Sequence, residues 1–240
     1  LLAAFNHLHI FIDPNPDPAK SWTERQRLFK MPRSSWSDYD VKKISKGGGV
    51  FDRSAKSLTL SSEIQAALGI QHSKVAPFEL IRHILQMPAD LMWFGGIGTY
   101  IRGGDESDIT VGDRGNDAVR IGADAVRAKV IGEGANLGVT QQGRIEFALN
   151  GGRINTDAID NSAGVDCSDH EVNIKILLSD VVTAGDLTGK QRDRLLAEMT
   201  DRVADLVLLD NYQQTQALTL AESDGAQALD GQNRLMRQLE

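Results

Sequence analysis

The chain has 240 residues, of which 41% are hydrophobic and 25% are charged, and its formal net charge at pH 7 is −7. These values are typical of a folded globular protein, and the excess of acid provides no broad basic surface for a nucleic-acid partner. The single cysteine, Cys167, excludes an internal disulfide and favours a reducing compartment. No apolar run reaches the roughly 18 residues of a membrane span. We therefore expect a cytoplasmic protein with neither a nucleic-acid nor a membrane partner.

The N-terminal quarter begins with a strand and continues into an irregular region. Residues 8–12 are apolar and β-prone, and they end at Asp13 before the turn cluster PNPDP. Ser21, with Glu24 three residues later, has the spacing of a capping box and predicts the start of a short helix. Residues 31–60 carry mixed signals, which indicates a loop-rich insertion with short strands.

Helices and strands are then expected to alternate. The first two predicted elements are a helix in SSEIQAALGI that stops at Gly69 and a helix in APFELIRHILQM with Phe78, Ile81 and Leu85 on its apolar face. A buried strand in DLMWFGG and a polar helix in GDRGNDAVRIGADAVRA follow. The remaining elements are a strand in KVIGEG, a helix in TQQGRIEFALNGG, a strand in RINTDAI and a helix over residues 168–182. This alternation predicts an α/β fold with a doubly wound, mostly parallel sheet.

From residue 188 onward the pattern is helical. Apolar residues recur every three to four positions at Leu195, Leu196, Met199, Val203, Leu206 and Val207, and the tail continues with breaks at Gly225 and Gly231. A C-terminal helical segment over residues 186–240 follows. The start without Met and the uncapped end indicate a piece of a longer polypeptide.

Small or polar residues follow four of the predicted strands. They are Asp13, the turn of Gly95, Gly96, Ile97 and Gly98, the stretch 132–136 with Gly134 and Asn136, and the stretch 160–164 with Asn161. In open parallel sheets, ligands bind beyond the carboxyl ends of the strands, so these residues outline one crevice.

Each of these residues also has a purely structural interpretation. Asp13 either accepts hydrogen bonds from the ribose hydroxyls of NAD or caps the turn before Pro14. The turn at Gly95 lacks the third glycine of the dinucleotide fingerprint, and it either lets a ligand approach the backbone or is a tight turn. Asn136 and Asn161 suit a carboxamide or carboxylate partner, or they are turn and cap residues.

The stretch DCSDHE allows two further interpretations. Ser168 and Glu171 have capping-box spacing, at a helix N-terminus that can also attract a carboxylate. Cys167 and His170 are close in sequence, but adjacency does not build a nucleophilic site. His7 and His9 lack a third metal ligand nearby. We therefore assign no catalytic residue and no metal site.

The motifs resemble those of a known family. EGAN followed by NSAGVDCS resembles the paired motifs of glutamate dehydrogenases, and HIFIDP, FGGIGTY and GGRINTDAIDNSAGVDCSDHEVNIK are similar to the large bacterial NAD-dependent enzymes. The resemblance covers essentially all 240 residues and is most specific between Asp90 and Leu178. Ser162-Ala163 departs from the more usual Ala-Gly, and residues 166–170 are more polar than in the small enzymes of the family.

The resemblance implies a Rossmann-like, NAD-binding domain over residues 1–185, whose N-terminal strand is missing. It implies NAD as hydride acceptor and L-glutamate and 2-oxoglutarate as substrates. By position, Asp13 would meet the adenosine ribose, residues 95–98 would pass near the dinucleotide, and Asn136 and Asn161, with Gly134 beside them, would contact the nicotinamide half. Ser168 would hold the distal carboxylate of the substrate.

The family's catalytic lysine and aspartate and its pyrophosphate glycines lie outside this sequence, in the rest of the parent chain. We therefore expect the fragment alone to be inactive, and the parent to be a homo-oligomer. Two alternatives stay open: a dehydrogenase for another amino acid such as leucine or phenylalanine, which Ser168 argues against, and a non-catalytic nucleotide-sensing or assembly module.

Overall fold

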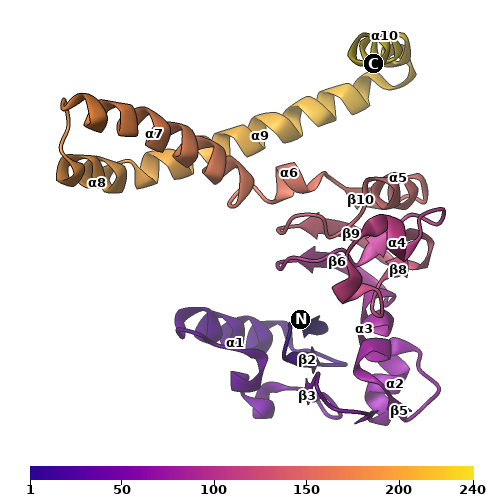
Figure 1. Ribbon diagram of the computed structural model, residues 1–240. Helices are drawn as coiled ribbons and strands as arrows, with labels where there is room; N and C mark the ends of the chain where they lie inside the picture. The colour runs from indigo at the N-terminus through magenta and orange to yellow at the C-terminus, as the bar shows by residue number, and fades with distance from the viewer. The chain divides into compact units, whose positions relative to one another are not determined.

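The computed structural model describes residues 1–240, which divide into two compact units. Unit 1 contains Leu1–Gly132 and Leu137–Ile154, and unit 2 contains Glu133–Asn136 and Asn155–Glu240 (Figure 1). The chain is α/β and ends in a helical segment, as predicted. None of its helices combines the length and the apolar character that crossing a membrane requires.

A three-stranded antiparallel sheet forms the N-terminal part of unit 1. Its order is β1 (Ala3–Phe5), β2 (His9–Ile12) and β3 (Gly49–Asp52), and α1 (Pro18–Lys30) follows β2. Because side chains alternate along a strand, Ile10 and Ile12 enter the main core while Phe11 packs on Trp36 and Tyr39 in a second cluster. The strand is thus buried on both faces.

The remaining elements of unit 1 surround the main core. They are the 3-10 turns η1 (Trp36–Asp38) and η2 (Val41–Lys43), the antiparallel pair β4 (Leu58–Thr59) and β5 (Lys74–Val75), α2 (Ser62–Leu68), α3 (Pro77–Leu85), the parallel pair β7 (Ile101–Arg102) and β8 (Ile121–Gly122), α4 (Asp108–Val111), η3 (Arg114–Asn116) and η4 (Ala123–Ala125). Helix α2 is bounded as its sequence predicts, since the Ser61 side chain caps its start and Gly69 ends it in a left-handed conformation.

The third sheet of unit 1 positions two of the predicted site segments. Its order is β10 (Arg153–Ile154), β9 (Ala128–Glu133) and β6 (Ala89–Phe94), with β9 and β10 parallel and β6 beside β9 (Figure 1). Helix α5 (Gln141–Leu149), capped by Thr140, connects β9 to β10. The glycine turn follows β6 and the EGAN stretch ends β9.

Unit 2 is mainly helical. It contains α6 (Asp157–Asp160), α7 (Val165–Ala184), α8 (Gly189–Glu198), α9 (Thr200–Asp224), η5 (Gly225–Ala228) and α10 (Leu229–Leu239). Helices α7 and α9 lie side by side, and the buried residues Leu178, Val203 and Val207 come from these two helices (Figure 1). The break at Gly225 is confirmed, whereas Gly231 lies inside α10.

Several predicted elements differ from the structure. The strands form four separate small sheets, and β2 pairs antiparallel with both neighbours, so one continuous, mostly parallel sheet is not observed. Helix α1 begins at Pro18 with Asp17 as its cap, which places Ser21 and Glu24 inside the helix. The polar helix expected over residues 112–128 is replaced by η3, β8 and η4, because Gly112 ends α4 in a left-handed conformation.

The burial of β6 and α3 and the length of β10 also differ from the prediction. One face of β6 is exposed at Leu91 and Trp93, although the strand was expected to be buried. Helix α3 buries Leu80, Ile81, Ile84 and Leu85 but leaves Phe78 exposed. Strand β10 has two residues instead of seven, because α6 begins at Asp157.

Candidate functional site

The turn of Gly95, Gly96, Ile97 and Gly98 leaves β6 at its carboxyl end and is fixed at the next residue, Thr99. The Thr99 amide donates to Asp113 Oδ2 at 2.9 Å, and the Thr99 carbonyl accepts from Arg120 Nε at 2.9 Å. Ile97 is 90% exposed. The turn therefore presents backbone and one apolar side chain to solvent from a fixed base.

Gly98 could not be replaced without strain. Its φ is +138°, and a Cβ there would lie 2.6 Å from Asn116 Nδ2. Asn116 Nδ2 donates to Asp113 Oδ2 at 2.7 Å. The bond from Thr99, followed by that from Asn116, lowers the pKa of Asp113, so the carboxylate stays charged and keeps both donors.

Arg120 is the buried cation beneath this turn. Its Nη1 lies 2.6 Å from Asp117 Oδ1 and 2.9 Å from Asp108 Oδ1, and its Nη2 donates to the Asp113 carbonyl at 2.6 Å. The Arg120 side chain is fully buried, and the neighbouring carboxylates supply the negative charge that offsets its loss of water. The sequence prediction placed Asp113 and Asp117 in a polar helix and Asp108 in a solvated loop, and it missed the cluster.

The two predicted asparagines lie together in unit 2. Asn161 Nδ2 donates to Asn136 Oδ1, which joins the EGAN stretch to the turn that precedes α7. The Asn161 carboxamide also lies against Gly164, where a Cβ would be 2.4 Å from Asn161 Oδ1. A larger residue at position 164 would push the carboxamide out of this position.

Asp160 also joins the EGAN stretch to the segment that precedes α7. Its Oδ2 accepts from the Glu133 amide at 3.0 Å, and its Oδ1 accepts from Asn155 Nδ2 at 3.2 Å. Both bonds join residues that lie between the last residue of β9 and the start of α7. Asp160 is therefore a positioning residue that sequence analysis noted at a strand end without giving it a role.

Ser168 is exposed in the first turn of α7, but it does not cap the helix. The helix starts at Val165 after Gly164, and the Ser168 amide donates to the Gly164 carbonyl at 3.1 Å. Glu171 pairs with Lys175 at 3.0 Å instead of bonding back to a cap. The predicted capping box is wrong, because the helix begins three residues earlier than expected.

The neighbouring His170 and Asp166 have different environments. His170 Nε2 lies 2.8 Å from Asp210 Oδ2, which ties α7 to α9. Asp166 is buried, and its Oδ2 has no hydrogen-bond partner. Burial, then the charges of Asp210 and Asp169, raise the pKa of Asp166 above its usual value, while His170 opposes them.

Asp13, expected to meet a ribose, is 1% exposed. Its Oδ1 accepts from both the backbone amide, at 3.1 Å, and the hydroxyl of Ser45, while its Oδ2 is buried without a partner. The carboxylate therefore holds Ser45 at the end of β2, and it is closed to solvent in this structure.

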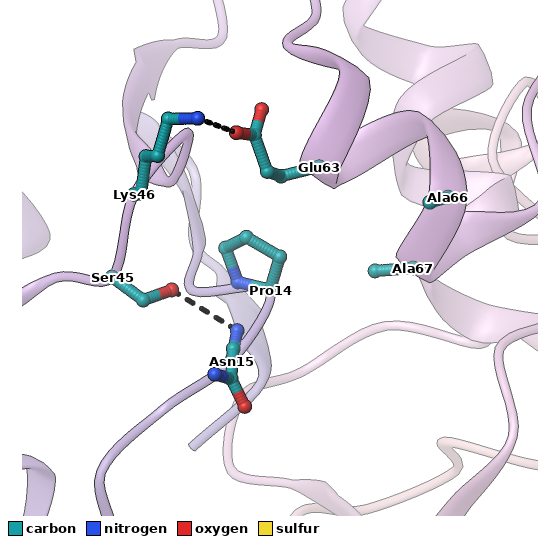
Figure 2. Close-up of a pocket in the computed structure, with 7 residues that line it drawn as sticks. All are labelled: Pro14, Asn15, Ser45, Lys46, Glu63, Ala66 and Ala67. Atoms are coloured by element: carbon teal, nitrogen blue, oxygen red, sulfur yellow. Dashed lines mark hydrogen bonds and ion pairs between the residues drawn. The ribbon is translucent and has the colours of Figure 1, made fainter.

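A cavity of about 490 Å³ lies beside the residues that follow Asp13 (Figure 2). It is lined by Pro14, Asn15, Ser45, Lys46, Glu63, Ala66 and Ala67. Lys46 Nζ lies 3.0 Å from Glu63 Oε1, and the Asn15 amide donates to Ser45 Oγ at 3.0 Å (Figure 2). The sequence prediction assigned no site residue to this pocket, because its walls come from three segments that are separate in the sequence.

The cavity of unit 1 and the paired asparagines of unit 2 each carry polar groups of a kind that nucleotide ligands use. The cavity combines small apolar walls with a few polar groups, which is the usual character of a site for a flat ring with hydroxyl groups. The paired asparagines retain further amide donors and acceptors, which match a carboxamide such as that of nicotinamide.

Residues 1–221 match the family model described as the catalytic domain of bacterial NAD-glutamate dehydrogenase. The chain is 59% identical over 240 residues to the NAD-specific glutamate dehydrogenase of Pseudomonas aeruginosa and 58% identical over 240 residues to that of Halomonas elongata; each match covers 100% of this chain and 15% of the relative. The corresponding protein of Mycobacterium tuberculosis is 58% identical over 235 residues, covering 95% of this chain and 14% of the relative. The chain thus spans about 15% of the length of these relatives, and the resemblance stated from its motifs is confirmed.

Proposed function

The chain belongs to the family of bacterial NAD-glutamate dehydrogenase catalytic domains, and from this premise we propose that it is the cofactor-binding part of an enzyme that converts L-glutamate, NAD and water to 2-oxoglutarate, ammonia, NADH and a proton. The NAD-binding region would comprise residues 1–185, and residues 186–240 would be a helical segment. The sheet β10-β9-β6 would be part of a doubly wound, Rossmann-like sheet, with further strands supplied by the rest of the parent chain.

The pairing of Asn136 with Asn161 is the observation that carries the proposal. Two glycine-containing segments far apart in sequence bring their only carboxamides together, and Asp160 fixes the backbone beside them. An asparagine offers two donors and an acceptor, so one mutual bond leaves groups for a nicotinamide carboxamide. Gly134, two residues before Asn136 in the sequence, has no side chain of its own that could crowd these amides.

The other predicted residues would have supporting roles. The fixed turn at residues 95–98 would pass near the dinucleotide, and the end of β2 at Asp13 would mark its adenosine end. Ser168, exposed on the first turn of α7, would hold the distal carboxylate of glutamate. NAD, when bound, accepts the hydride, and these residues orient the ring and the substrate.

The first test is the rate of NAD reduction with glutamate by the intact parent enzyme and its Asn161→Ala variant. We expect kcat/KM to fall by about 100-fold, since loss of a positioning group costs on the order of 10² in rate. Asn173→Ala is the matched control, because Asn173 is an exposed asparagine further along α7, and its rate should stay within about twofold of wild type.

Other outcomes would redirect the assignment. Equal rates for Asn161→Ala and wild type would remove Asn161 from the site and favour a nucleotide-sensing or assembly module. A parent enzyme that reduces NAD with leucine or phenylalanine but not with glutamate would belong to the other amino-acid dehydrogenases. Turnover of glutamate by the 240 residues alone would contradict the placement of the catalytic groups elsewhere in the parent chain.

A further inference from the structure

Two glycines allow the segment that forms one wall of the cavity at the end of β2 to pack closely against its neighbours. Gly47 has a φ of +81°, and a Cβ there would lie 2.6 Å from Glu63 Oε2. At Gly48 a Cβ would lie 2.7 Å from the Ile12 carbonyl and 2.9 Å from Pro14 Cδ. The glycine run therefore allows the segment with Ser45 and Lys46 to pass close to both β2 and α2.

One face of α2 forms the opposite wall. Glu63, Ala66 and Ala67 are spaced i, i+3 and i+4, so they share the helix face toward the cavity (Figure 2). The two alanines leave the room that larger side chains would fill. Glu63 is the acid on this wall, and its side chain is 31% exposed.

Asp13 and Glu63 both lie beside this cavity, and of these two acids only Glu63 is accessible. The Asp13 carboxylate is buried and bonded to Ser45. Glu63 lines the cavity and pairs with Lys46, whose side chain is 92% exposed. An acid that accepts bonds from the ribose hydroxyls must reach the ligand, and in this structure Glu63 meets that condition while Asp13 does not.

We propose that this cavity takes the adenosine half of the dinucleotide and that Glu63, held by Lys46, accepts hydrogen bonds from its ribose hydroxyls and excludes a 2′-phosphate; the proposal rests on the cofactor-binding function above. Asp13 acts indirectly, since it fixes Ser45 and thereby the start of the segment that carries Lys46. The ion pair sets the selectivity. While Glu63 is charged it repels phosphate, and once that charge is removed Lys46 becomes a phosphate-binding cation.

The experiment measures binding rather than turnover, in the intact parent enzyme, by calorimetric titration with AMP and with adenosine 2′,5′-bisphosphate. For Glu63→Gln we expect AMP to bind about tenfold more weakly and the bisphosphate about tenfold more tightly. In the double variant Glu63→Gln with Lys46→Met, the gain for the bisphosphate should disappear. A change of less than twofold in both constants for Glu63→Gln would overturn the proposal.

Asp90→Asn is the matched control. Asp90 and Lys129 form another exposed ion pair of unit 1, 2.7 Å apart and outside the cavity lining, so both dissociation constants should be unchanged. A loss of AMP binding in Asp90→Asn equal to that in Glu63→Gln would attribute the effect to net charge and overturn the proposal.

Failure of this inference and failure of the cofactor role give different results. If wild type binds AMP and reduces NAD while Glu63→Gln changes neither constant, the cofactor role stands and the assignment of Glu63 is wrong. If wild type binds neither AMP nor NAD, the cofactor role fails, and the assignment fails with it.

Discussion

Glu24 in α1 and Asp166 in α7 are both acids removed from solvent, one in each compact unit, and their surroundings shift their pKa values in opposite directions. Both Glu24 oxygens are bonded: Oε1 accepts from Arg27 at 2.6 Å and from the Asp40 amide at 2.9 Å, and Oε2 accepts from Lys43 at 2.6 Å. The bond from Arg27 is the main cause that lowers the pKa of Glu24 to about 2, against the opposing effect of burial.

Asp166 is buried but lacks the cationic and backbone donors that surround Glu24. Its Oδ2 is unbonded, and its charged neighbours Asp210 and Asp169 are acids, so its pKa rises. Burial alone therefore does not decide whether an acid stabilises a fold. The supply of donors decides it, because each bond to the charged form offsets the loss of water. Glu24 should therefore stabilise unit 1, whereas ionised Asp166 should destabilise unit 2.

The strongest test of this difference is Glu24→Gln. The change removes the charge but keeps the shape, and it leaves Arg27 and Lys43 without their common partner. We expect the free energy of unfolding to fall by about 3 kcal/mol, the lower end for a broken buried pair, because both cations retain partial access to water. Urea denaturation followed by tryptophan fluorescence measures this, since Trp22 lies on α1 and Trp36 lies in the adjoining cluster.

Glu198→Gln provides the control for that measurement. Glu198 forms an exposed pair with Arg194 at 3.6 Å, and its loss should change stability by less than about 0.5 kcal/mol. An equal loss in the two variants would mean that the Glu24 cluster contributes no more than a surface pair.

The pH dependence of unfolding sharpens the same comparison. The pKa of Glu24 is lower in the folded state than the ordinary value of 4.5, so its contribution is fully present above pH 4.5 and is lost as the pH falls toward about 2. The difference in unfolding free energy between wild type and Glu24→Gln should shrink across this window, as urea titrations at a series of pH values would measure. A difference that stays constant from pH 6 to pH 3 would contradict the charge-based explanation.

The predicted elements that agree with the structure are those whose boundaries depend on residues close in the sequence. Helices α2 and α5 were predicted well because their caps, Ser61 and Thr140, are local. The start of α7 was misplaced because Ser168 has the capping pattern, whereas the helix actually starts after Gly164, where the Asn161 carboxamide lies against the backbone. Local spacing carries no information about that contact.

The candidate site shows the same limit. Asn136 and Asn161 were singled out because each is an amide among small residues, and the structure pairs them. The cavity lined by Glu63 was not predicted, since Ser45 and Glu63 come to line the same cavity only through the folding of a glycine-rich segment. The glycine run was the one available signal, because adjacent glycines often mark a close backbone approach.

Asp166→Asn should give the smallest effect and the opposite sign. The amide removes a charge that faces Asp210 and Asp169, and its Nδ2 supplies a donor that the acid lacks. We expect the free energy of unfolding of unit 2 to rise by about 1 kcal/mol at pH 7, as followed by helical circular dichroism. Because the folded pKa of Asp166 is raised, the penalty that the wild type carries at neutral pH vanishes below about pH 3.8, and the two proteins should converge there. Asp169→Asn, an exposed acid three residues along the same helix, should give less than half of this gain; equal gains would assign the effect to the overall charge of α7 rather than to the unbonded oxygen of Asp166.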